Sequence, residues 1–111
     1  MNSSLLPGSE MSTTVRTRDD GAVYELLGES VSRFPIARGV LETVRLLEKG
    51  KAKTVVMAAN VEPRERLDVV RSLCERKGVT VILVPDRARL GRAAGLEVGA
   101  SCVALPVVLP L

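Results

Sequence analysis

The sequence predicts one α/β domain in which helices cover both faces of a buried sheet. Three apolar runs of strand length, residues 53–59, 79–84 and 101–108, alternate with segments of helical periodicity. These runs contain few interleaved polar residues, which is typical of strands buried on both faces. The helix between the first two runs predicts that they pair in parallel through a right-handed crossover. An apolar share of 46% in 111 residues indicates one globular domain.

The N-terminal part is predicted to consist of a tail followed by a helix. Residues 1–14 are rich in Ser and Thr, so we expect a flexible tail there and a single domain over 15–111. Asp19 and Asp20 supply an N-cap and early negative charge for a helix that continues through Leu27.

A short extended segment and a second helix follow. We expect residues 32–36 to be extended, because Pro35 disfavours helical backbone at the residue before it. Residues 38–49 then show helical periodicity, and Gly50 is placed to end this helix. The apolar face of the helix comprises Val40, Val44 and Leu47, with Leu41 beside them.

Each of the two remaining helices follows a buried strand. Residues 60–63 are expected to form a turn that leads into a helix over 64–77. Asp86 is expected to cap a short helix over 87–94, and Pro106 interrupts the last strand. The predicted core face of the longer helix comprises Leu67, Val70, Leu73 and Cys74.

The composition excludes several classes of protein. The chain contains no His, which excludes hydrolases with Ser-His-Asp or Cys-His sites and metalloproteases with an HExxH motif. Cys74 and Cys102 are too few for a disulfide framework, and we expect both to be buried apolar side chains in a reducing compartment. No apolar run is long enough to span a bilayer, and no signal peptide is visible. We therefore expect a cytoplasmic protein.

The glycines and neighbouring acids have simpler explanations than catalysis. Gly91, Gly95 and Gly99 lack the spacing of a phosphate-binding loop and are expected at helix ends and tight turns. Glu62 and Glu65 lie in a turn and a first helical turn, where they stabilise the helix dipole. We expect no enzymatic activity, no cofactor and no metal site.

The charge is unevenly distributed along the chain. The net charge is +3, but residues 38–95 contain 13 basic and 7 acidic residues, a balance of +6. Such a basic central region favours a polyanionic partner such as RNA, although an ordinary solvated surface explains it as well. Tyr24 and Phe34 are the only aromatic residues, so a protein that stacks single-stranded bases on aromatic side chains is not expected.

Three blocks of the sequence carry a resemblance to a known family. They read RGVLETVRLLEKGKAKTVVMAANVEP at 38–63, LCERKGVTVILVP at 73–85 and LGRAAGLEVGASCVAL at 90–105. Together they hold 55 of the 111 residues. In order and spacing they resemble the L7Ae kink-turn-binding ribosomal proteins of archaea and their eukaryotic relatives in small nucleolar and spliceosomal particles.

The resemblance implies a fold and a function. The fold would be a three-layer α/β/α sandwich around a four-stranded mixed sheet, with the segment before Arg38 as the fourth strand. The function would be that of an RNA-binding ribonucleoprotein component, ribosomal or ribosome-associated, that recognises a kink-turn or similar structured RNA. Its partners would be rRNA or small guide RNA and other proteins of the particle, with no membrane partner.

The RNA-binding signature of the family, Gly-x-Asn-Glu-x-x-Lys, falls at the start of the second helix. Gly39 and Glu42 match it, and Arg45 keeps the positive charge of the Lys. Leu41 stands where the amide of Asn reads the sheared G·A pairs of a kink-turn. A Leu side chain forms no hydrogen bond, and the absence of a polar interaction with a base costs roughly 1–3 kcal/mol. Alternatively, Leu41 widens the apolar face of its helix.

The resemblance assigns further residues to RNA binding. Glu62 lies where the family has an acidic residue near a flipped-out nucleotide, and residues 96–98 resemble the apolar loop beneath extruded bases. Lys51 and Lys53 are placed to meet phosphate, although both could simply be solvated, and the 96–98 loop could simply pack at the start of a strand. A basic rim comprises Arg87, Arg89 and Arg92. The complete predicted set is Arg38, Gly39, Leu41, Glu42, Arg45, Lys51, Lys53, Glu62, Arg87, Leu96, Glu97 and Val98.

Two features favour an alternative function. Leu41 and the apolar C-terminal segment, residues 103–111, are also expected of a divergent paralogue that has lost kink-turn recognition. Such a protein would act as a protein-interaction module or a general rRNA binder. The C-terminal segment would then extend the last strand, cover exposed core or dock on a neighbour.

Overall fold

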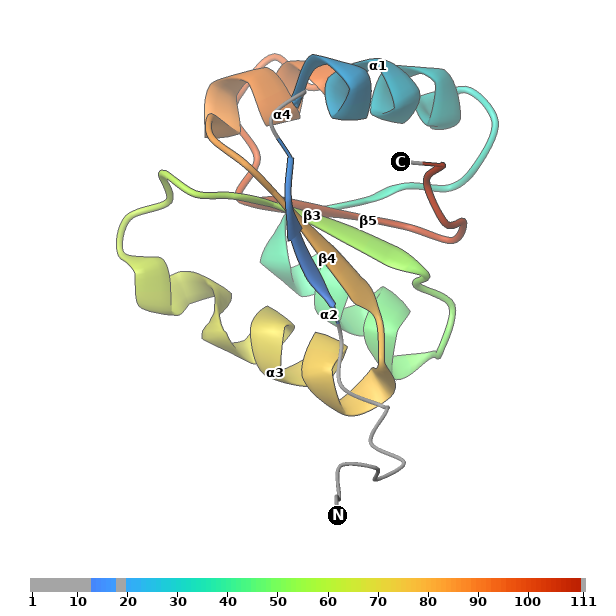
Figure 1. Cartoon of the computed structure of the whole chain (residues 1–111), viewed down its shortest axis with the longest axis vertical. Helices are drawn as coiled ribbons and strands as arrows, with labels where there is room; N and C mark the ends of the chain where they lie inside the picture. The colour runs from blue at the N-terminus through green and yellow to red at the C-terminus, as the bar shows by residue number, and fades with distance from the viewer. Residues whose placement is uncertain (1–12, 18–19, 111) are drawn as a thin grey trace.

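The computed structural model describes residues 13–17 and 20–110 as an α/β/α sandwich (Figure 1). Helices α1 and α4 cover one face of the sheet, and α2, η3 and α3 cover the other. In chain order the elements are β1 (Thr14–Arg16), α1 (Asp20–Val31), β2 (Ala37–Arg38), α2 (Gly39–Glu48), β3 (Thr54–Ala58), the 3₁₀ helix η3 (Arg64–Leu67), α3 (Asp68–Lys77), β4 (Thr80–Val84), α4 (Arg87–Ala93) and β5 (Cys102–Leu105).

The sheet is mixed and has the strand order β1-β4-β3-β5-β2. Strands β3 and β4 pair in parallel as predicted, with Thr54 opposite Thr80. Strand β5 runs antiparallel to both β3 and β2. The sheet has five strands rather than the four expected, because β1 adds to the edge beside β4 in parallel register.

Strand β1 was not expected, since a three-residue edge strand has too little sequence to show a period. It places Val15 opposite Ile82, and the amide of Val81 donates to the carbonyl of Thr13 at 2.8 Å. Residues 1–12 of the predicted tail lie outside the described residues. The last residue of the predicted tail, Thr14, belongs to β1.

The core lies on both faces of β3, as the uninterrupted apolar run predicts. All five residues of β3 are buried, and Val55, Val56 and Met57 are fully inaccessible. The predicted core face of the 64–77 helix, Leu67, Val70, Leu73 and Cys74, is buried. Both thiols are buried, and desolvation raises the pKa of Cys102 and raises the pKa of Cys74 to about 12.

Helix boundaries follow local chemistry, with one difference from the expectation. The predicted 64–77 helix is divided into η3 and α3, because Leu67 leaves helical geometry with φ −97° and ψ 1°. Gly78 ends α3 in the left-handed conformation with φ 67°. The Asp86 carboxylate caps α4 as predicted by accepting from the amide of Ala88 at 3.0 Å.

The bounds of two strands also differ from expectation. The expectation that residues 32–36 are extended is wrong for 32–34, which form a turn because the amides of Arg33 and Phe34 donate to the carbonyl of Ser30 at 3.0 and 2.9 Å. Strand β2 begins only at Ala37. Strand β5 ends at Leu105, because Pro106 has no amide hydrogen with which to continue the ladder. Beyond it, Leu109 is buried and Val107 packs on the core, so this segment covers apolar surface. Among the described residues, no helix is long and apolar enough to cross a membrane.

Candidate functional site

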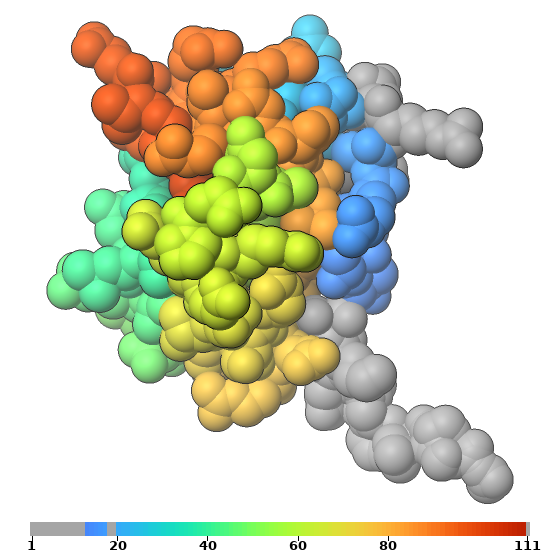
Figure 2. Space-filling model, turned by 90° about the vertical axis from the view of Figure 1, so that its left-hand side faces the viewer, coloured from blue at the N-terminus to red at the C-terminus, as the bar shows by residue number. Residues whose placement is uncertain are grey.

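The end of the sheet at which β3 and β4 finish gathers most of the residues predicted to bind RNA. Ala58 lies opposite Val84 at the last residue of each strand, and Arg38 pairs with Val103 near the start of β5. Figure 2 views this end and shows η3 and its preceding turn at the centre, α4 above them and α2 on the left. The strand-end surface is defined here as residues 38–45, 60–63, 66, 86–88 and 96–101.

Arg38 holds two parts of this surface together. Its Nε donates to the carbonyl of Ala94 at 2.7 Å, and one terminal nitrogen donates to the carbonyl of Ile36 at 3.2 Å. The side chain thereby ties the start of α2 to the C-terminal end of α4. Because the guanidinium is engaged with backbone, Arg38 positions the surface rather than projecting freely from it.

Glu42 organises the first turn of α2. Its Oε1 accepts from the backbone amide of Arg38 at 3.0 Å, which satisfies a donor that no intrahelical carbonyl reaches. The carboxylate also lies at the positive end of the helix dipole. Glu42 is exposed, so its second oxygen can accept a hydrogen bond from a ligand.

Two apolar side chains project from the strand-end surface. Leu41 is 63% exposed and Val98 is 69% exposed. The alternative that Leu41 widens the apolar face of α2 is therefore wrong, because the helix turns this position away from the sheet. The neighbouring Leu96 behaves differently, since it is half-buried and packs against the core. Glu97 and Arg45 are exposed.

Gly39 and Gly91 allow the backbone to follow this path. Gly39 has φ 86°, a conformation that L side chains rarely adopt. A Cβ on Gly91 would lie 2.0 Å from the carbonyl oxygen of Val98. Gly91 is therefore required for the close approach of α4 to the 96–101 loop. The expectation that it marks a helix end or tight turn is wrong, because Gly91 lies inside α4.

Asn60 connects the turn after β3 to the start of α4, a role that sequence reasoning missed. Its Oδ1 accepts from the amide of Arg87 at 2.8 Å, and its Nδ2 donates to Oδ1 of Asp86 at 3.4 Å. The same Asp86 oxygen caps α4. The only indication of this role in the sequence was the position of the Asn directly after a buried strand.

A depression of about 520 Å³ lies between these two segments. It brings the predicted residues Glu62 and Arg87 together with Arg66, which was not predicted. The depression thus offers carboxylate, amide and guanidinium groups within one concave surface. Its lining comprises Asn60, Val61, Glu62, Arg66, Asp86, Arg87, Ala88 and Ser101.

The structure does not bring every predicted residue to this surface. Lys51 and Lys53 precede β3, so they lie at the opposite end of the sheet. Lys53 borders a separate depression with Lys77 at that end. Arg89 of the predicted basic rim stacks over the ring of Tyr24, with 4.5 Å between its Cζ and the ring centroid. In the described part of the chain, no group of three or more potential metal ligands occurs.

Comparison with known proteins shows which proteins share this architecture. A model of the ribosomal protein L7Ae/L30e/S12e/Gadd45 family matches residues 21–108. The 15.5kD RNA binding protein of Giardia lamblia is similar with a TM-score of 0.76 and 25% identity, over 86% of this chain and 80% of that chain. A Bacillus halodurans protein of unknown function has the same fold, with a TM-score of 0.69 and 19% identity over 77% of this chain and 84% of that chain.

Proposed function

We propose that this chain, which belongs to the ribosomal protein L7Ae/L30e/S12e/Gadd45 family, is an RNA-binding component of a ribonucleoprotein. The family membership confirms the resemblance seen in the sequence. The similarity to the Giardia lamblia RNA binding protein supports the assignment to RNA. We further propose that the RNA is a kink-turn or a similarly structured element of ribosomal or guide RNA, bound in the cytoplasm.

The observation that carries this proposal is the convergence of separate segments on the strand-end surface. The start of α2, the turn after β3 and the 96–101 loop meet at one end of the sheet, held by the contacts of Arg38 and Asn60. A fixed concave surface of this kind suits a folded RNA, whose shape is recognised along with its bases.

The chemistry of the surface permits distinct roles. Arg45, Arg66 and Arg87 can contact phosphate, which positions the RNA without reading its sequence. Glu42 can accept from an exocyclic amino group of a base. The depression that contains Glu62 and Arg66 is suited to one extruded nucleotide, because it combines acceptors for a base with a cation for its phosphate.

The test is binding of the purified protein to a kink-turn RNA and to the same RNA with its G·A pairs changed, at two salt concentrations. We expect tighter binding to the intact kink-turn, and weaker binding of both RNAs at higher salt because phosphate contacts release counterions. Arg87→Gln should weaken binding to the kink-turn, whereas Arg33→Gln, a charge-matched control outside the surface, should not. No binding to either RNA would contradict the proposal.

One observation favours a second candidate function. Leu41 and Val98 are both exposed on the strand-end surface, where apolar side chains contribute little to phosphate binding. They would suit a protein-interaction module that has lost kink-turn recognition. A general rRNA binder, which would rely on the basic side chains instead, is the other form of this alternative. Equal binding to intact and altered kink-turns, with steep salt dependence, would favour the general rRNA binder.

A further inference from the structure

We propose that a cavity between β1 and η3 is a second RNA contact, which binds backbone phosphate of the helix flanking the kink-turn. This inference rests on the proposed function and extends it to a face that the resemblance does not assign. The cavity has a volume of about 250 Å³. Its lining comprises Thr14, Arg16, Ala58, Ala59, Val61, Arg64, Leu67, Arg71 and Leu83.

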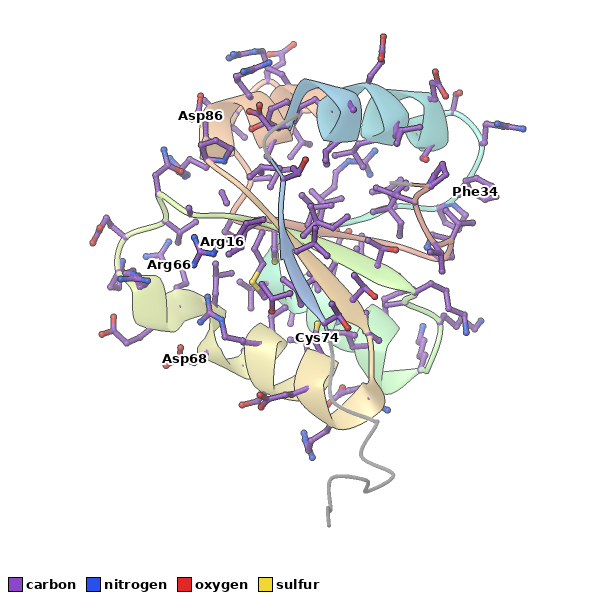
Figure 3. All side chains as sticks on the ribbon, in the orientation of Figure 1. Arg16, Phe34, Arg66, Asp68, Cys74 and Asp86 are labelled. Atoms are coloured by element: carbon purple, nitrogen blue, oxygen red, sulfur yellow. The ribbon has the colours of Figure 1, made fainter. Side chains whose placement is uncertain are left out.

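Three arginines from three different elements converge on this cavity. Arg16 comes from β1, Arg64 from η3 and Arg71 from α3, and none of the described residues that line the cavity is acidic. Figure 3 shows the Arg16 side chain reaching from β1 towards the side on which η3 lies. Like charges gathered around one cavity repel one another. An anion bound among them would be attracted to all three and would offset their repulsion, which favours its binding.

The arginines are largely free to accept such an anion. Within the described ranges, neither Arg16 nor Arg64 has a carboxylate at ion-pair distance. Arg71 pairs with Asp68 at 3.4 Å, but both side chains are at least half exposed, and a pair of this kind contributes little. The guanidinium groups can therefore turn to phosphate, which they bind in a bidentate manner.

The floor of the cavity strengthens this attraction. Val61 and Leu67 are buried side chains, and Leu83 is partly buried. An apolar floor lowers the local dielectric constant, which increases the energy of a charge pair relative to the same pair in water. The hydroxyl of Thr14 adds a neutral donor for a phosphate oxygen.

The position of the cavity points to RNA as its partner. Val61 lines both this cavity and the depression proposed to hold an extruded nucleotide. On η3, Arg64 lines the cavity and Arg66 lines the depression, so one short helix separates the two sites. In Figure 2 β1 lies to the right of η3 and α2 to its left. An RNA helix that leaves the strand-end surface towards β1 would pass over the arginines.

The experiment compares two double variants that remove the same charge. Arg16→Gln with Arg64→Gln tests the cavity, and Arg33→Gln with Arg76→Gln is the control. All four arginines are exposed, so both variants should retain the thermal stability of the unaltered chain. The probes are a kink-turn RNA with an extended flanking helix, the same RNA trimmed to the kink, and each with its G·A pairs changed.

We expect the cavity variant to bind the extended RNA more weakly than the control does. Its plot of log affinity against log salt should be shallower by about 0.9 for each phosphate that the variant no longer neutralises. The preference for intact G·A pairs should be retained, and the trimmed RNA should bind both variants equally.

Three outcomes would overturn the inference. The first is that the two variants bind the extended RNA with equal affinity and equal salt dependence, which would leave the proposed function intact. If the cavity variant then bound an acidic peptide more weakly than the control did, the cavity would be assigned to a protein partner. The second is that the cavity variant loses as much affinity for the trimmed RNA as for the extended RNA, which would exclude the flanking helix as the part of the RNA that the cavity contacts. Failure of the unaltered chain to bind any of the RNAs would overturn the proposed function as well.

Discussion

Leu41 lies where the family signature has an Asn, and its exposure separates two explanations for the difference. A buried Leu would have been part of the core, and replacing it would cost stability. At 63% exposure it instead faces any ligand of the strand-end surface. The residue at position 41 therefore bears on recognition of RNA and hardly on packing.

The substitution Leu41→Asn tests this directly. If the rest of the surface is intact, the restored amide should tighten kink-turn binding by roughly 1–3 kcal/mol, because it provides the missing hydrogen bonds to a base. The free energy of unfolding should fall by no more than about 0.5 kcal/mol, from the lower helix propensity of Asn. Affinity measured by titration and stability measured by urea unfolding separate the two effects.

Val108→Asn is the matched control for that experiment. Val108 is 71% exposed and borders a depression with Lys53, at the end of the sheet opposite the strand-end surface. It should leave RNA affinity unchanged. Equal affinity of Leu41→Asn and the unaltered chain for the kink-turn would support the paralogue that has lost this recognition.

The elements differ in how well they can be predicted from the sequence. Strands β3 and β4 could be predicted because both faces are buried, and α2 and α3 because their apolar residues recur with helical spacing. Strand β1 could not, since its three residues become a strand only through pairing with β4, which is distant in sequence. The division of the 64–77 helix into η3 and α3 likewise depends on the backbone at Leu67, which has no local sequence pattern.

Contacts between elements explain why part of the site could not be predicted from the sequence. Residues such as Glu42 and Glu62 could be selected by resemblance, but Asn60 and Arg66 acquire their positions only when β3 and α4 pack together. The arginine cavity has the same origin, because Arg16 and Arg71 are 55 positions apart in the chain.

Two glycines in helices allow a matched test of helix packing. Gly91→Ala should lower the free energy of unfolding by about 2 kcal/mol or more, because its Cβ would lie 2.0 Å from the carbonyl oxygen of Val98. Gly28→Ala in α1 should instead raise it by roughly 0.5–1 kcal/mol, since the nearest atom is 3.9 Å away and Ala favours the helix. Both values follow from chemical denaturation, and a Gly91→Ala protein as stable as the unaltered chain would refute the close approach.

The domain as a whole buries two thiols whose ionisation is coupled to unfolding. Cys74 and Cys102 are fully inaccessible. Burial raises the pKa of Cys74 from 9.0 to about 12 and raises the pKa of Cys102 as well. The folded chain therefore keeps these protons at pH values at which the unfolded chain releases them.

The sign of the resulting pH dependence follows from this difference. The stabilising contribution of a protonated Cys74 is fully present below pH 9.0 and is lost progressively as the pH rises towards 12. Between about pH 8 and about pH 10, the unaltered chain should lose roughly 1 kcal/mol more stability than Cys74→Ala does. Other titrating groups, including Tyr24, are common to both proteins and cancel in the comparison. Urea midpoints measured across this range provide the test, and parallel pH profiles for the two proteins would show that Cys74 ionises equally in the folded and unfolded states.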